Sequence, residues 1–139
     1  MNSSISLIPS TPEGDFSVEA WRELRDTLLV AEPMFRDIAA RLKLKLLSSA
    51  RWPELRLQRR EGLTTTELRL ALNPDPTGNL QSECEWVINL VRYPRFAWLP
   101  VGGSSVETIQ VLSTKELRAG ELLLRHIQGA VSRLASSGT

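Results

Sequence analysis

The stretch ELRLQRREGLTTTELRLAL, residues 54–72, decides the fold class. Leucines alternate with polar or charged residues on both sides of Glu61-Gly62, which is the period of two that a half-buried β-strand shows. Gly62 offers the backbone freedom that a tight turn needs. The stretch therefore predicts an antiparallel hairpin with one leucine face and one charged face.

Folding this hairpin symmetrically about Glu61-Gly62 predicts its register. The cross-strand pairs that result are Leu55 with Leu68, Arg56 with Glu67, and Glu54 with Arg69. Opposite charges across a strand pair stabilise it. A three-residue turn would set a leucine against a glutamate, so the symmetric register is preferred.

More strands are expected after the hairpin. Residues 83–90 alternate and predict a third strand with Cys84, Trp86, Ile88 and Leu90 on one face and Glu83, Glu85, Val87 and Asn89 on the other. Tyr93-Pro94 is expected to bend the chain, and Phe96 and Trp98 to mark a short fourth strand. A fifth strand is expected over 106–112, with Ile109 and Val111 pointing inward.

Apolar residues at helical spacing occur before and after these strands. Ser17 is a candidate N-cap for a first helix, which Pro33 should end or kink so that a second helix carries Met34, Ile38, Leu42 and Leu46 inward. Ser113 and Glu116 have the spacing of a capping box. The final helix that follows is expected to bury Leu117, Leu124, Ile127, Val131 and Leu134.

This order of elements predicts an α+β fold: an antiparallel sheet of four to five meandering strands, with N-terminal helices and a C-terminal helix packed on one face. At 139 residues the chain has the length of one domain. We expect residues 1–14, rich in Ser and Pro, to form a disordered arm, and residues 15–136 to form the domain.

Composition limits the possible functions. The formal charge is +1, and the chain holds one histidine, His126, and one cysteine, Cys84. A single cysteine forms no internal disulfide, and the N-terminus lacks the cationic start of a secretory signal, so we expect a cytoplasmic protein. Asn73, Asp75 and Thr77 resemble the start of a calcium loop, but its twelfth position is Cys84. No catalytic residue, metal or cofactor is assigned, and a non-enzymatic function is favoured.

The leading hypothesis is a protein-binding module that recognises another protein through a charged sheet face, as a toxin-immunity protein, an adaptor or a regulatory subunit would. A homo-oligomer is compatible with it, and no membrane partner is expected. The residues assigned to this surface are Arg56, Glu67, Arg69, Glu83, Glu85 and Trp98.

Two other classes stay open. One is a small-ligand binder or carboxylate-dependent enzyme, whose sign would be an apolar pocket between sheet and helices with a polar group of shifted pKa. The other is nucleic-acid binding through the basic segment 36–60, which carries eight basic residues and only two acidic ones.

Overall fold

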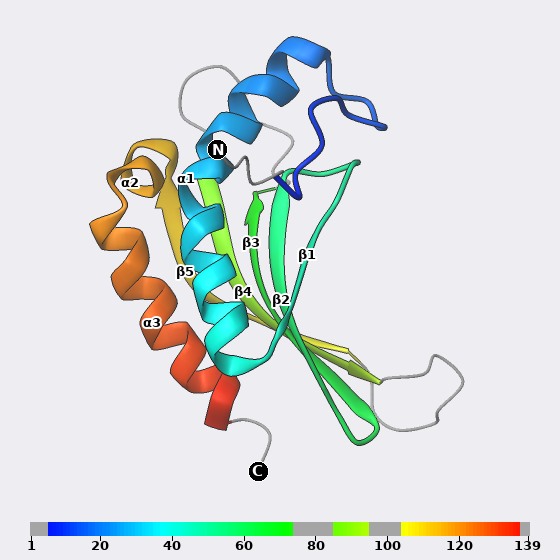
Figure 1. The fold of residues 1–139 in the computed structure, drawn as a ribbon, viewed down its shortest axis with the longest axis vertical. Coiled ribbons are helices and arrows are strands. Elements are labelled where there is room, and N and C mark those ends of the chain that lie inside the picture. The colour runs from blue at the N-terminus through cyan, green and yellow to red at the C-terminus, as the bar shows by residue number, and fades with distance from the viewer. Residues whose placement is uncertain (1–5, 74–84, 95–103, 137–139) are drawn as a thin grey trace.

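A five-stranded antiparallel sheet forms the centre of the protein, with strands in the order β1-β2-β3-β4-β5 and helices on one side (Figure 1). The computed structural model describes residues 6–73, 85–94 and 104–136. The α+β class and the antiparallel meander predicted from sequence are confirmed. The elements are α1 (Val18–Leu42), β1 (Lys45–Ser48), β2 (Glu54–Glu61), β3 (Thr64–Leu72), β4 (Glu85–Pro94), β5 (Ser105–Ser113), α2 (Thr114–Ala119) and α3 (Glu121–Ser136).

The N-terminal region holds one long helix, so the expected division into two helices is wrong. Ser17 caps α1 by accepting a hydrogen bond from the Ala20 N–H, and Pro33 lies inside the helix. A proline removes one helical N–H, but Pro33 is on the exposed side, where water can reach the carbonyl left without a donor. The helix ends at Lys43, whose φ of 57° is left-handed. Leu46, which was expected in the second helix, consequently belongs to β1.

The β2–β3 hairpin has a different register from the predicted one. Its turn is Gly62-Leu63, and the observed pairs include Leu55 with Leu70, Leu57 with Leu68, Arg56 with Arg69, and Gln58 with Glu67. Gly62 has a φ of 60° at the first central position, which a type II′ turn requires. The pairing is shifted by two residues, and a shift of two keeps every side chain on its expected face.

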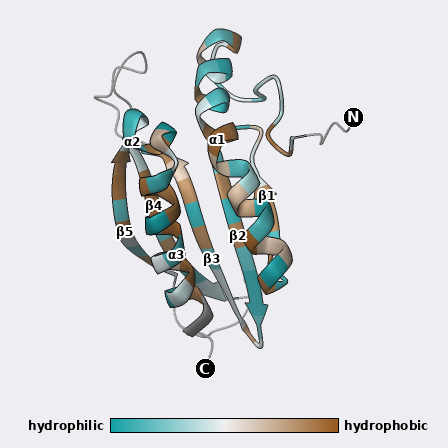
Figure 2. Cartoon of the chain, turned by 60° about the vertical axis from the view of Figure 1, so that its left-hand side comes forward, coloured by the Kyte–Doolittle hydropathy of each residue, from teal (hydrophilic) through white to brown (hydrophobic). Residues whose placement is uncertain are grey.

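The core lies between the leucine face of the sheet and the helices. In Figure 2 all three helices lie on the same side of the sheet. Side chains with no more than 2% exposure fill this layer, among them Trp21, Leu28, Phe35, Leu55, Leu57, Leu68, Leu70, Trp86, Ile88 and Leu112. Full burial of a side chain of this kind stabilises a fold by about 1.5–3 kcal/mol. Trp86 and Ile88 are thus on the predicted inner face.

A bulge between β4 and β5 changes the predicted inward residues of the last strand. The register shifts between Ile88 and Asn89, where β5 carries the extra residue. Ile109 packs against the core as expected, but Val111 lies opposite Val87 and is 43% exposed. Tyr93-Pro94 forms the end of β4. The expected strand at 96–98 lies outside the described residues, as does Cys84.

The C-terminal region holds two helices where one was expected. The capping box of Ser113 and Glu116 is confirmed, but α2 ends at Gly120, whose φ is 76°. The break resets the helical phase, so α3 buries Leu123 and leaves Leu124 40% exposed. No helix among the described residues is both long enough and apolar enough to cross a membrane.

Residues 6–14 pack onto the domain, whereas the sequence analysis placed them in a disordered arm. Ile8 is 1% exposed, and the Trp21 Nε1–H donates to the Pro9 carbonyl at 2.8 Å. The Glu32 carboxylate accepts hydrogen bonds from the Ser6 hydroxyl at 2.6 Å and from the Leu7 N–H at 3.2 Å. Burial of Ile8 and satisfaction of these polar groups hold the segment in place.

Two glycines provide a matched test of the helix break. An added Cβ meets nothing within 4 Å at either Gly120 or Gly129, but only Gly120 has a positive φ. We expect Gly120→Ala to destabilise the protein by about 1 kcal/mol, because a positive φ is strained for alanine. Gly129→Ala, inside α3, should stabilise it by about 0.5–1 kcal/mol. Denaturant unfolding measures both, and changes of the same sign would contradict this interpretation of the break.

Candidate protein-binding face

The sheet has a second face, which points away from the helices and which we call the open face. No described helix lies on it (Figure 1). By strand alternation and register its residues include Lys45 and Leu47 on β1; Glu54, Arg56, Gln58 and Arg60 on β2; Thr65, Glu67, Arg69 and Ala71 on β3; Glu85, Val87, Asn89, Val91 and Tyr93 on β4; and Val106, Thr108, Val111 and Ser113 on β5. The face is polar over β2 and β3 and becomes apolar toward β5.

Glu67 is the centre of the polar half. Its side chain has 0% exposure, although charged groups are almost never fully buried unless they are paired. Its Oε2 accepts hydrogen bonds from the Tyr93 hydroxyl at 2.5 Å and from the Gln58 Nε2 at 2.7 Å. Its Oε1 accepts one from the Arg69 Nε at 2.7 Å. Both carboxylate oxygens are therefore satisfied by donors from three strands.

This environment sets the charge states of Glu67 and Tyr93. Burial alone raises the pKa of the Glu67 carboxyl, but the hydrogen bonds from Tyr93, Gln58 and Arg69 outweigh it and lower the pKa below 4.5. Burial and the bond to the Glu67 carboxylate raise the pKa of Tyr93 above 10.0. At neutral pH Glu67 is charged and Tyr93 is protonated, so the hydrogen bond between them persists.

Two arginines lie directly opposite each other beside this carboxylate. Arg56 and Arg69 form a cross-strand pair, an arrangement of like charges that is unfavourable by itself. Glu67 offsets the repulsion, with its oxygens 2.7 Å from Arg69 and 3.7 Å from Arg56. Glu54 forms an ion pair with the Arg56 Nε at 3.1 Å. The geometry of this pair is not that of a hydrogen bond. The guanidiniums are held in place while 26% and 33% of their side-chain surfaces stay exposed.

The apolar half of the open face consists of two valine pairs. Val87 lies opposite Val111, and Val91 lies opposite Val106. Val106 is 62% exposed and Val111 43%, while their partners on β4 are buried. Two exposed valines thus lie on the same face as the fixed charge cluster, with β4 between them.

The structure brings together some of the residues assigned to the binding surface. Arg56, Glu67 and Arg69 form one cluster, but Glu67 is too buried to touch a partner and serves as its anchor. Glu85 is on the same face, exposed, and accepts a hydrogen bond from Asn73 at 3.2 Å. Glu83 and Trp98 lie outside the described residues.

Four further residues of this surface were not predicted from sequence: Gln58, Tyr93, Val106 and Val111. Extending the period of two along β4 from Glu85 would have placed Tyr93 on the same face as Glu85. The Tyr93-Pro94 pair, interpreted as a bend, hid that signal. Val111 was assigned inward because the bulge that turns it outward depends on the pairing with β4 and has no sequence marker.

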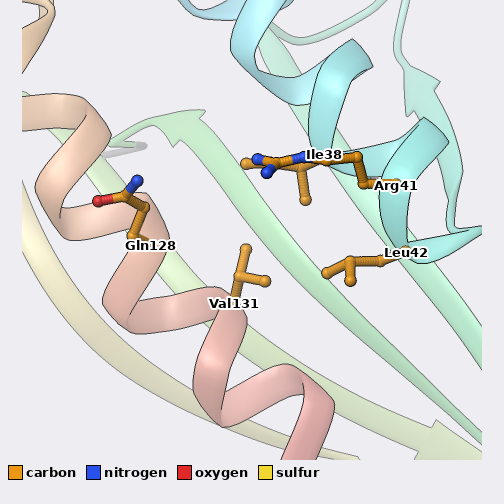
Figure 3. Close-up of a pocket in the computed structure, with 5 residues that line it drawn as sticks. All are labelled: Ile38, Arg41, Leu42, Gln128 and Val131. Carbon is orange, nitrogen blue, oxygen red and sulfur yellow. The ribbon is translucent and has the colours of Figure 1, made fainter.

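Two hollows lie on the helix side of the molecule. One, of 230 Å³, is lined by Ile38, Arg41, Leu42, Gln128 and Val131 (Figure 3). The other, of 420 Å³, is lined by Leu42, Lys43, Leu44, Arg59, Arg60 and Leu134. No described residue that lines these two hollows has a shifted pKa; the groups whose pKa is shifted are Glu32, Glu54, Glu67 and Tyr93. The described residues contain no group of His, Cys, Asp and Glu side chains that could hold a metal.

Comparisons with known proteins add no relative. The chain matches no protein-family model, no curated protein is significantly similar in sequence, and no solved structure is significantly similar in fold. Any function must therefore be argued from the residues themselves.

Replacement of Glu67 tests its role as an anchor. Glu67→Gln leaves Arg56 and Arg69 facing each other without a buried anion, and we expect a loss of about 3–5 kcal/mol in the free energy of unfolding. Glu61→Gln is the matched control, because Glu61 forms an exposed ion pair with Arg59 and should change stability by less than about 1 kcal/mol. Equal effects of the two variants would contradict an anchoring role.

The pH dependence has a definite sign. Because the folded pKa of Glu67 lies below its ordinary 4.5, the charged form stabilises the fold at any pH above that value. This contribution is lost as pH falls from 4.5 through the folded pKa. Glu67→Gln should therefore flatten the acid side of the stability curve, measured by chemical denaturation between pH values of about 6 and 3. An unchanged slope would show that Glu67 does not carry this titration.

Proposed function

We propose that the protein binds another protein through the open face of its sheet. The observation that carries the proposal is the pairing of exposed valines with arginines fixed by a buried carboxylate, on a face with no described helix over it. Protein interfaces combine a desolvated apolar centre with polar surroundings, and they are enriched in arginine. Val106 and Val111 would supply the apolar contact and Arg56 and Arg69 the oriented charge.

The fixed arginines support specific binding of one protein more than non-specific binding of many. An interface loses about 0.5–1.5 kcal/mol for each flexible side chain it must immobilise. Glu67 and Glu54 already hold Arg69 and Arg56, so less of that loss falls on binding. The Arg69 Nη atoms make no hydrogen bond to any described residue, and a guanidinium is suited to bidentate contact with a carboxylate of the partner.

This mode of binding suits a toxin-immunity protein, an adaptor or a regulatory subunit. Each works by binding a protein and not by catalysing a reaction. A cytoplasmic site of action is part of the same proposal, and a single cysteine, which forms no internal disulfide, is compatible with it.

Two exposed apolar residues allow a matched test of the face. Val111 on the open face is 43% exposed and Leu124 on α3 is 40% exposed. We expect Val111→Arg to reduce recovery of the bound protein at least about tenfold in affinity capture from the native host, because a charge would be buried at the contact. Leu124→Arg should capture as well as the original chain. Quantitative mass spectrometry of the eluates measures both.

The valine is a better probe than the neighbouring arginines. Replacing Arg69 also breaks its bond to Glu67, so a loss of capture could reflect a loss of stability. Val111→Arg keeps that cluster, and its unfolding midpoint should stay near that of Leu124→Arg. Equal capture by the two variants would contradict the open face as the binding surface.

A further inference from the structure

The two hollows on the helix side adjoin each other at Leu42, beside α1 and α3, and we call them together the α1–α3 groove. Leu42 lines both of them. In Figure 3 Ile38 and Leu42 of α1 and Val131 of α3 reach into the space between the two helices. The larger hollow, of 420 Å³, falls within the range of about 300–1,000 Å³ typical of small-molecule sites.

The floor of the groove is aliphatic. Its apolar lining residues are Ile38, Leu42, Leu44, Val131 and Leu134. Leu42 is 45% exposed, so apolar surface already meets water there. Among the described lining residues neither hollow has an aromatic ring, the stacking platform that single-stranded nucleic acid uses. The floor therefore suits a saturated chain better than a base or a flat ring.

The rim of the groove is cationic, and none of the described residues that line it carries a carboxylate. Two of its cations have structural roles: Arg41 pairs with Asp37 at 3.1 Å, and Arg59 donates to the Leu134 carbonyl at 3.3 Å and to Glu61 at 2.9 Å. The side chains of Lys43 and Arg60 form no ion pair or hydrogen bond with any residue that the structure describes. Two cations next to an aliphatic floor are thus available to an anion.

We propose that the α1–α3 groove binds a free aliphatic carboxylate, such as a fatty acid, with its chain along Leu42, Leu44 and Val131 and its head group at Lys43 and Arg60. Burial of the chain supplies non-directional attraction, and the two cations fix the polar end. Leu42 is the one described residue that lines both hollows, and a single chain lying across it suits the groove better than the two chains of a phospholipid. Arg60 has the strand parity of the open face, but it lies beyond the end of β1, at the free edge of β2, where it lines the larger hollow. The proposal does not depend on the function proposed for the open face.

Decanoate is a suitable probe, with decanol as its neutral match. Titration of the full chain, followed by calorimetry and by the methyl NMR signals of Leu42, Leu44 and Val131, should show saturable binding of decanoate below its micelle concentration. Decanol should bind at least about tenfold more weakly, because it makes no charge-assisted contact. Arg60→Glu should weaken decanoate binding by at least about tenfold, and Leu42→Asp should abolish it.

Arg22→Glu is the matched charge control, because Arg22 is exposed near the other end of α1 and lines neither hollow. It should bind decanoate normally, as should Val111→Arg on the open face. Equal affinity for decanol and decanoate, or equal loss in Arg22→Glu and Arg60→Glu, would overturn the proposal. So would binding to anionic phospholipid vesicles without binding to decanoate, since the occupant would then be a membrane surface.

Discussion

The burial of Glu67 is the constraint on which the open face depends. A carboxylate with no exposed surface must have its oxygens satisfied by donors, and here they come from Gln58, Arg69 and Tyr93 on β2, β3 and β4. These bonds join three strands on the side that the helices leave uncovered. They also bring Arg56 and Arg69 together, which the two charges would otherwise resist. The same interaction thus stabilises the sheet and shapes its surface.

The two faces of the sheet are stabilised in different ways. On the helix side leucines and tryptophans bury apolar area. The hydrophobic effect is non-directional, so this packing is compatible with an exposed groove at the ends of α1 and α3. On the open face directional hydrogen bonds hold charges at defined positions. A surface of the second kind suits recognition of one partner, while a groove of the first kind suits an aliphatic chain. The two proposed sites can therefore act independently.

Much of the fold follows from sequence because alternation and capping are local signals. The period of two over 54–72 assigned Leu55 and Leu68 to the core and Arg56 and Arg69 to the other face, and Ser113-Glu116 marked a helix start. The alternation alone does not define the register, because Gly62 occupies the first turn position and this shifts the pairing by two residues from the predicted one. The exposure of Val111 and Leu124 follows from a bulge and from the left-handed Gly120. Those features arise from tertiary pairing and backbone conformation, which a hydrophobic period does not record.

Amide hydrogen exchange, measured with and without a protein recovered by affinity capture, shows most directly whether the open face contacts another protein. We expect slower exchange on binding in β5 around Val106 and Val111 and near Arg56 and Arg69, with no change in the exposed helical surface around Leu124. Protection confined to α1 and α3, with β5 exchanging as in the free protein, would contradict it.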